Sequence, residues 1–121
     1  MQPTRDEITA VTKLIRRALG PYNLKPSAED IASLTDDLIT HGQRHVARAQ
    51  AIRKAHRVTG ALQDWHDLMT HGPEGDPLGN WNYARSIARV VRTLHNALLE
   101  EGRRRELIGR TALPPIVDRT L

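Results

Sequence analysis

Apolar residues recur every three to four positions through most of the chain, which is the spacing of amphipathic helices. The first stripe follows Thr4 and Glu7, which have the spacing of a helix-capping box. This helix is expected to end at Gly20-Pro21. Its predicted apolar face consists of Ile8, Val11, Leu14, Ile15, Ala18 and Leu19.

A second stripe begins after Ser27, a residue type that commonly caps helices. No proline occurs between Ser27 and Pro73, so this helix is expected to run almost unbroken to about Met69. A continuous helix of that length would span on the order of 60 Å, which is long for a domain of this size. We therefore expect a bend or break, most simply at Gly42 or Gly60, because glycine is unfavourable inside a helix.

Residues 70–79 are rich in glycine and proline and are predicted to form a loop. The last long helix follows this loop and is expected to fade near Glu101-Gly102, while Pro114 and Pro115 indicate an extended end. The pattern thus predicts an all-α fold, a small bundle of about four helices with a long second helix and a long last helix. Residues 1–109 would form this single domain, and residues 110–121 an extended, proline-containing C-terminal tail.

Composition narrows the function classes. The chain has 121 residues, of which 39% are hydrophobic and 3% aromatic, so a core of Leu, Ile, Val and Ala is expected. It contains no cysteine, which excludes disulfides, thiolate nucleophiles and Cys-ligated metal centres. Neither a membrane span nor a signal peptide is recognisable, and we expect a soluble, cytoplasmic protein with no membrane partner.

The whole chain has a formal net charge of +4, and its positive residues are concentrated in the middle of the sequence. Residues 41–60 contain no carboxylate, whereas residues 61–78 contain no Lys or Arg. Such segregation gives an uneven field that biases the approach of partners. The predicted partner- or nucleic-acid-binding surface consists of Arg44, Arg48, Arg53 and Arg57 with Arg85, Arg89 and Arg92 of the last helix. The alternative interpretation is that these arginines simply form the solvent-exposed polar faces of amphipathic helices.

His41 and His45 are four residues apart and can share one side of the second helix, so they are candidate metal ligands. The motif lacks the glutamate of the zinc-protease signature. Counting in sevens from Ile31 instead places both histidines, with Arg48, on the helix seam. In that interpretation they mark a polar middle of the bundle or specify the register of a dimer.

Two tryptophans flank the predicted loop, and Trp65 and Trp81 are expected to pack on each other in the core. The alternative is an aromatic-lined ligand pocket with His66 and Tyr83 at its rim.

No catalytic signature is present, because Cys, Gly-x-Ser-x-Gly and a phosphate-binding glycine loop are all missing. We expect no cofactor and no enzymatic activity. The favoured function is an interaction or accessory regulatory protein with a protein partner, forming a homodimer through Leu113, Ile116 and Val117. A nucleic-acid-binding protein that uses residues 41–60, and a metal- or small-ligand-binding helical protein, remain alternatives.

Three stretches resemble a family of small helical streptomycete proteins often labelled natural product biosynthesis proteins. The resemblance lies in residues 28–38 followed by His41-Gly42, in the turn at residues 71–75, and in residues 82–94. It implies an all-helical bundle and a role in secondary metabolism, without an agreed activity. This chain departs from the family in having no proline in residues 44–69, and Leu94-His95-Asn96 where the family has Cys-Asp-His.

Overall fold

The computed structural model describes the backbone of residues 3–52, 55–76 and 78–118, and side chains through Ile108. Over these residues it contains helices and no strand, which confirms the predicted all-α fold with a long second and a long last helix. No helix in these ranges is long and apolar enough to cross a membrane. The helices are α1 (Arg5–Ala18), α2 (Ala28–Ala49), α3 (His56–His71) and α4 (Gly79–Asp118), with 3-10 turns η1 (Tyr22–Leu24) and η2 (Gln50–Ile52).

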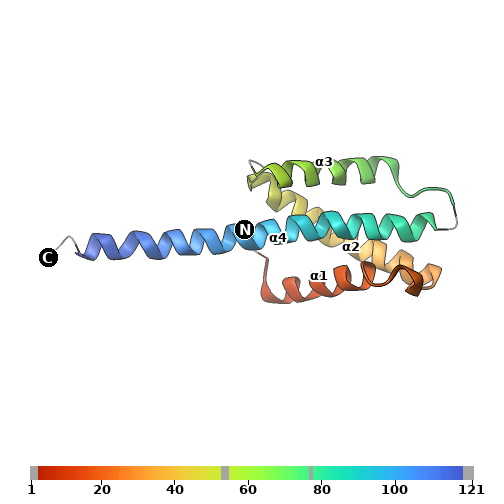
Figure 1. Cartoon of the computed structure of the whole chain (residues 1–121), viewed down its shortest axis with the longest axis horizontal. Helices are drawn as coiled ribbons and strands as arrows, with labels where there is room; N and C mark the ends of the chain where they lie inside the picture. The colour runs from red at the N-terminus through yellow and green to blue at the C-terminus, as the bar shows by residue number, and fades with distance from the viewer. Residues whose placement is uncertain (1–2, 53–54, 77, 119–121) are drawn as a thin grey trace.

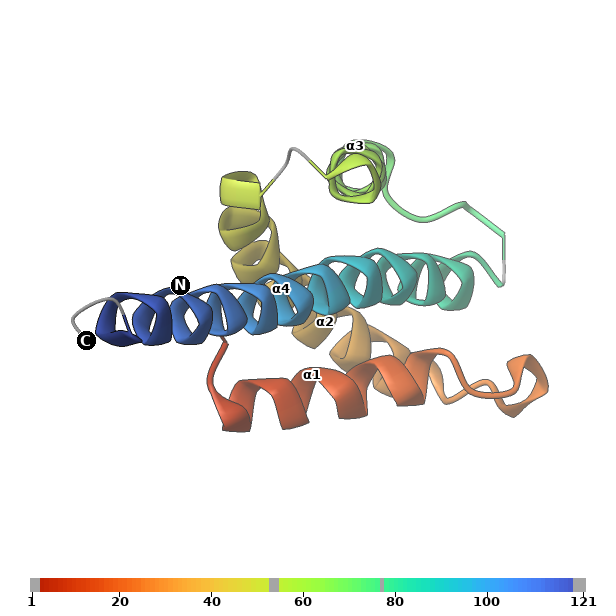
Figure 2. The ribbon, with the colours of Figure 1, turned by 60° about the vertical axis from the view of Figure 1, so that its left-hand side comes forward.

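Helix α4 is the centre of the bundle, because it packs against α1, α2 and α3. α1 and α3 lie on opposite sides of its first half, and α2 crosses it obliquely (Figures 1 and 2). The second half of α4 projects beyond the ends of the other helices (Figure 1). The first half of α4 therefore completes the core, whereas its second half extends beyond the bundle.

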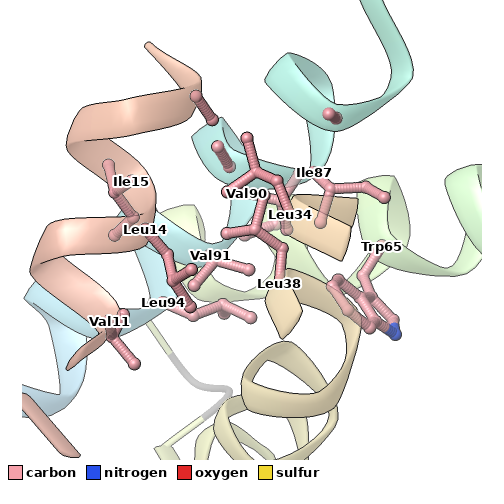
Figure 3. Close-up of a cluster of buried hydrophobic side chains, with 14 of the residues drawn as sticks. Val11, Leu14, Ile15, Leu34, Leu38, Trp65, Ile87, Val90, Val91 and Leu94 are labelled. Atoms are coloured by element: carbon pink, nitrogen blue, oxygen red, sulfur yellow. The ribbon is translucent and has the colours of Figure 1, made fainter. Parts of the chain in front are cut away.

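The core forms where the apolar stripes of the four helices meet. Figure 3 shows side chains from all four converging, with Trp65 contributed by α3. Full burial of one aliphatic or aromatic side chain stabilises the fold by about 1.5–3 kcal/mol. The buried side chains labelled there are Val11, Leu14, Ile15, Leu34, Leu38, Trp65, Ile87, Val90, Val91 and Leu94.

Two helix starts follow the predicted caps. Thr4 Oγ1 accepts a hydrogen bond from the backbone N–H of Glu7 at 3.1 Å, and Ser27 Oγ accepts one from Asp30 at 3.2 Å. The Glu7 carboxylate, however, is paired with Arg48 of α2, at 3.0 Å. Thr4 thus makes the first hydrogen bond of a capping box. The Glu7 side chain, which would make the second, instead links α1 to α2.

The break in the long second helix is in neither predicted place. α2 ends at Ala49 and α3 begins at His56, so Gly42 and Gly60 both lie inside helices. Gly42 is buried beside Trp65, and a Cβ built on it would overlap atoms Cη2 and Cζ3 of the indole ring. The prediction was wrong because this glycine permits a close helix contact, a role that local propensity does not reveal.

The end of the chain also differs from the expectation. α4 continues through Gly102, and its backbone stays helical through Pro114 and Pro115 to Asp118. The fixed φ of proline, near −65°, is compatible with a helix, but each proline inside a helix removes one backbone hydrogen bond and crowds the carbonyl oxygen four residues earlier. The predicted extended tail over residues 110–118 was therefore wrong. Residues 119–121, and the side chains of Leu113, Ile116 and Val117, lie outside the described part.

The predicted loop between α3 and α4 is present. Gly72 follows α3 with φ 69°, a left-handed conformation that favours glycine. Asp76 then accepts hydrogen bonds at the start of α4, through Oδ1 from the N–H of Leu78 at 2.9 Å and through its carbonyl from Gly79 at 3.0 Å. The loop thereby returns the chain so that α4 can run beside α3.

Candidate functional site

A buried polar cluster lies where α1, α2 and α4 meet. His45 of α2 is 0% exposed and His95 of α4 is 4% exposed, and they are the buried polar side chains of the described chain. Glu7 of α1 and Arg48 of α2 form an ion pair at 3.0 Å, with 10% and 18% of their side chains exposed. Polar groups buried to this degree need partners, so the geometry of the cluster is tightly constrained.

The two histidines form a hydrogen-bonded chain with the backbone. His45 Nδ1 lies 2.8 Å from the carbonyl oxygen of His41, and because a carbonyl only accepts, this nitrogen carries the proton. His45 Nε2 lies 2.9 Å from His95 Nδ1. In the neutral pair, His95 Nδ1–H therefore donates to His45 Nε2. His95 Nε2 is then a lone-pair acceptor, buried without a hydrogen-bond partner among the described residues.

Burial holds both imidazoles neutral. Desolvation lowers the pKa of His45 below the ordinary 6.5, while its bond to the His41 carbonyl opposes that shift. Desolvation likewise lowers the pKa of His95, and the Glu7 charge opposes that shift. The hydrogen bond from Arg48 lowers the pKa of Glu7, so the carboxylate stays charged. At neutral pH the cluster consists of one ion pair beside two uncharged rings.

His41 and His45 do not form the predicted pair of metal ligands. Both ring nitrogens of His45 are engaged, one by the His41 carbonyl and the other by His95. No group of three or more His, Cys, Asp or Glu side chains within the described ranges is arranged to hold a metal ion. His45 instead lies on the helix seam, the position that the sevenfold count gave it.

The sequence missed Glu7 and His95 as members of this cluster. Glu7 lies four and seven residues before Val11 and Leu14, so it falls on the apolar face of α1. His95 follows Val91 by four residues on the buried side of α4. A charged or polar residue in register with an apolar stripe was the signal that could have identified both.

The predicted basic residues do not form one continuous surface. Arg48 is turned inward onto Glu7, and Arg44 lies 3.8 Å from the same carboxylate with 57% of its side chain exposed. Arg57 of α3 is paired with Glu100 of α4. Arg89 and Arg92 are exposed on α4, whereas Arg53 lies outside the described residues. The basic segment 41–60 is therefore divided between two helices.

Arg85 was wrongly grouped with the exposed row, because it closes the end of α1. Its Nη1 donates to the carbonyl oxygens of Ala18 at 2.9 Å and Gly20 at 2.7 Å. Its guanidinium also lies 5.3 Å from the ring centroid of Tyr22 and 5.4 Å from that of Trp81. A cation at these carbonyls satisfies acceptors that the helix leaves open and complements its dipole.

Replacement of Arg85 by methionine is expected to destabilise the fold by about 1.5–3 kcal/mol, the range for hydrogen bonds to charged groups. Methionine retains an apolar stem beside the Tyr22 and Trp81 rings and removes the hydrogen-bond donors together with the positive charge. Arg92→Met, on the exposed side of α4, is the matched control and should change stability by less than about 0.5 kcal/mol. Urea denaturation followed by circular dichroism measures both, and equal midpoints would contradict the capping role.

The four predicted pocket residues do not share one pocket. Trp65 packs beside Gly42, while Trp81 donates from Nε1 to the Tyr22 carbonyl at 3.3 Å. Both tryptophans are buried, as the core interpretation required, but they serve different contacts. Tyr83 donates its hydroxyl to the Leu68 carbonyl at 3.2 Å, and His66 is exposed. Of these four, Tyr83 alone lines a small cavity of about 220 Å³, between α2 and the start of α4.

A larger groove lies where the second half of α4 leaves the bundle. It encloses about 530 Å³ between the α2–α3 junction and α4. Its apolar floor includes Ile52, Val58 and Ala97, and its polar rim includes Arg57, which pairs with Glu100. On the α4 side, Glu101 pairs with Arg104 and with Arg105, each at 3.2 Å.

α4 continues from this groove as an exposed helix. Every described residue from Arg103 to Ile108 is exposed, and among them Leu107 and Ile108 are 61% and 59% exposed. We call residues 103–118 the α4 arm. At 1.5 Å per residue, an arm of about 16 residues is about 24 Å long. Two consecutive exposed aliphatic residues on a projecting helix make this surface a candidate for interaction.

Comparison with known proteins gives one relationship. The model of a family described as a family of unknown function (DUF6415) matches residues 9–103. The match includes α2, α3 and the half of α4 that packs in the bundle, with His45 and His95, and it stops where the α4 arm begins. No curated protein and no solved structure matches the chain.

Proposed function

We propose that this chain, which belongs to the DUF6415 family, is a non-enzymatic interaction protein that binds a protein partner through the α4 arm and the groove at its base. The observation that supports this function is the exposure of Leu107 and Ile108 on a helix that projects from a complete bundle. Exposed aliphatic residues beside a polar rim are a common feature of protein-binding surfaces.

The chemistry of the groove favours a helical protein segment as the occupant. An apolar floor with charged edges suits the apolar face of an amphipathic helix, which would place its polar side against the Arg57, Glu101 and Arg104 rim. Nucleic-acid binding is the weaker proposal, because Arg48 and Arg57 of the basic segment are already in ion pairs. A role in secondary metabolism, as an accessory regulator, is proposed on the resemblance alone.

The double substitution Leu107→Glu and Ile108→Glu is expected to reduce partner retention at least tenfold, because it places two carboxylates on the contact surface. Glutamate is a good helix former, so the helix itself should persist. Leu24→Glu is the matched control, since Leu24 is 67% exposed on η1, far along the chain from the arm. Quantitative co-purification from the native cells, using the tagged chain and both variants, provides the measurement.

The expected result is loss of specific proteins with the double variant and full retention with Leu24→Glu. If the same proteins were retained in equal amounts by all three chains, the α4 arm would not be the binding surface.

A further inference from the structure

The groove and the exposed Ile108 lie on one face of α4. At about 100° per residue, Ala97, Glu101, Arg104 and Ile108 fall within about 60° of one another around the helix. The first three line the groove, and Ile108 lies one turn beyond Arg104. A single helix lying along this face of α4 would therefore contact the groove floor and Ile108 together.

The chain itself contains a helix of the required kind. The arm, about 24 Å long, continues α4 beyond the residues that line the groove, and the helix period places the exposed Ile108 on the groove face. A surface that contains both a groove and the helix to fill it is self-complementary, which is the requirement of a two-fold interface.

Deepening the proposed function, on which this inference rests, we propose that the groove is occupied by the α4 arm of a second copy of the chain. The two arms lie antiparallel, and a two-fold axis passes near Ile108 of each. Residue 104 of one copy is then opposite residue 112 of the other. The end of each arm, near residue 118, lies beside residue 98 of the partner, at the groove.

Charge favours the antiparallel direction. Arg103, Arg104 and Arg105 are consecutive at the base of the arm, and Glu101 is the neighbouring acid that pairs with two of them. A parallel pair in register would bring both arginine runs side by side at one level. The antiparallel pair separates the two Arg104 residues by about 12 Å along the axis at 1.5 Å per residue, more than the Debye length of about 8 Å at physiological salt. It also brings position 110 of each copy, an arginine, level with Glu106 of the other, whereas a parallel pair would place like charges side by side at both positions.

The absence of cysteine from the chain makes the arrangement directly testable. Arg104→Cys and Ala112→Cys are made singly in the full chain, and each is oxidised with copper phenanthroline, alone and mixed with the other. In the antiparallel pair, the thiols of the two different variants face each other and lose their two hydrogens to the oxidant to form a disulfide. The mixture should therefore give at least fivefold more covalent dimer than either variant alone.

Light scattering supplies the second measurement. Wild type and Leu24→Glu should show about twice the monomer mass of 13.6 kDa, and Ile108→Glu the mass of one chain. Stronger cross-linking of each variant with itself than with the other would overturn the antiparallel proposal. A wild-type chain that stays monomeric at all concentrations would overturn the second copy as occupant. Partner retention that still depended on Leu107 and Ile108 would then leave the proposed function standing, so the two failures are distinguishable.

Discussion

Acidification from pH 7.5 to pH 5 is expected to destabilise the bundle strongly, through His45 and His95. Burial lowers the pKa of both imidazoles below the ordinary 6.5. The unfolded chain therefore binds protons near pH 6.5 that the native state does not bind. Because stability rises with pH wherever the unfolded state binds more protons, it is fully present above about pH 6.5 and is lost as the pH falls below that value.

The expected size follows from the number of groups. Each histidine contributes at most about 1.4 kcal/mol per pH unit, so two contribute at most about 2.7 kcal/mol per unit. The free energy of unfolding of a domain of this size is typically about 5–15 kcal/mol, so a fall of one or two pH units below 6.5 would remove a large part of it. The Glu7 carboxylate, whose pKa is also lowered, loses its contribution below its ordinary value of 4.5, outside this window.

Urea denaturation followed by circular dichroism at pH 7.5, 6.5 and 5.5 measures the effect. His45→Leu combined with His95→Leu removes both titrating groups, so the pH dependence of stability should become flatter. The double variant should still fold, because replacing both partners of a buried hydrogen bond by apolar groups is often nearly neutral for stability. His66→Asn, at an exposed position of α3, should keep the wild-type slope. A double variant with the wild-type slope would show that other groups govern the acid response.

Gly42→Ala is expected to destabilise the bundle by about 3 kcal/mol or more, at the upper end of overpacking effects. The added Cβ would overlap the Trp65 ring and approach Cγ2 of Val91 to 3.1 Å. An indole ring that is 7% exposed has little room to move away. This cost exceeds the gain of about 1 kcal/mol that alanine normally brings to a helix interior.

Gly60→Ala is the matched control, because a Cβ at Gly60 would meet nothing within 4 Å. The same chemical change should there stabilise α3 by about 0.4–1 kcal/mol. Opposite signs at the two glycines, measured by urea denaturation at neutral pH, are the expected outcome. Adding Trp65→Leu to Gly42→Ala should cost less than the sum of the two single changes, and strict additivity would contradict the proposed contact.

Local signals in the sequence were sufficient for the helices and their starts. The apolar stripes predicted which faces are buried, and Thr4 and Ser27 begin helices as their residue types indicate. A break in the long second helix was expected, but its place was predicted wrongly, because the sequence between Ala49 and His56 contains neither glycine nor proline. Both α2 and α3 pack on α4, so the place where α2 ends depends on contacts of the whole bundle and not on local residue types.

The candidate sites depended on long-range contacts and were therefore less predictable. By periodicity Arg85 belongs to the polar side of α4, yet its guanidinium donates hydrogen bonds to backbone carbonyl oxygens at the end of α1. His45 could be placed on the seam by counting, but its partner His95 is 50 positions away. The rotation of each helix about its own axis decides such pairs, and one-dimensional spacing does not contain it.

The central position of α4 has a consequence for biosynthesis. α1, α2 and α3 leave the ribosome before α4, the helix against which all three pack. Until residues as late as Leu94 and Leu98 have emerged, the apolar faces of α1, α2 and α3 cannot be buried in a complete core. A nascent chain of this protein should therefore be a client of chaperones for most of its synthesis, and a stalled product lacking the last helix should be degraded quickly.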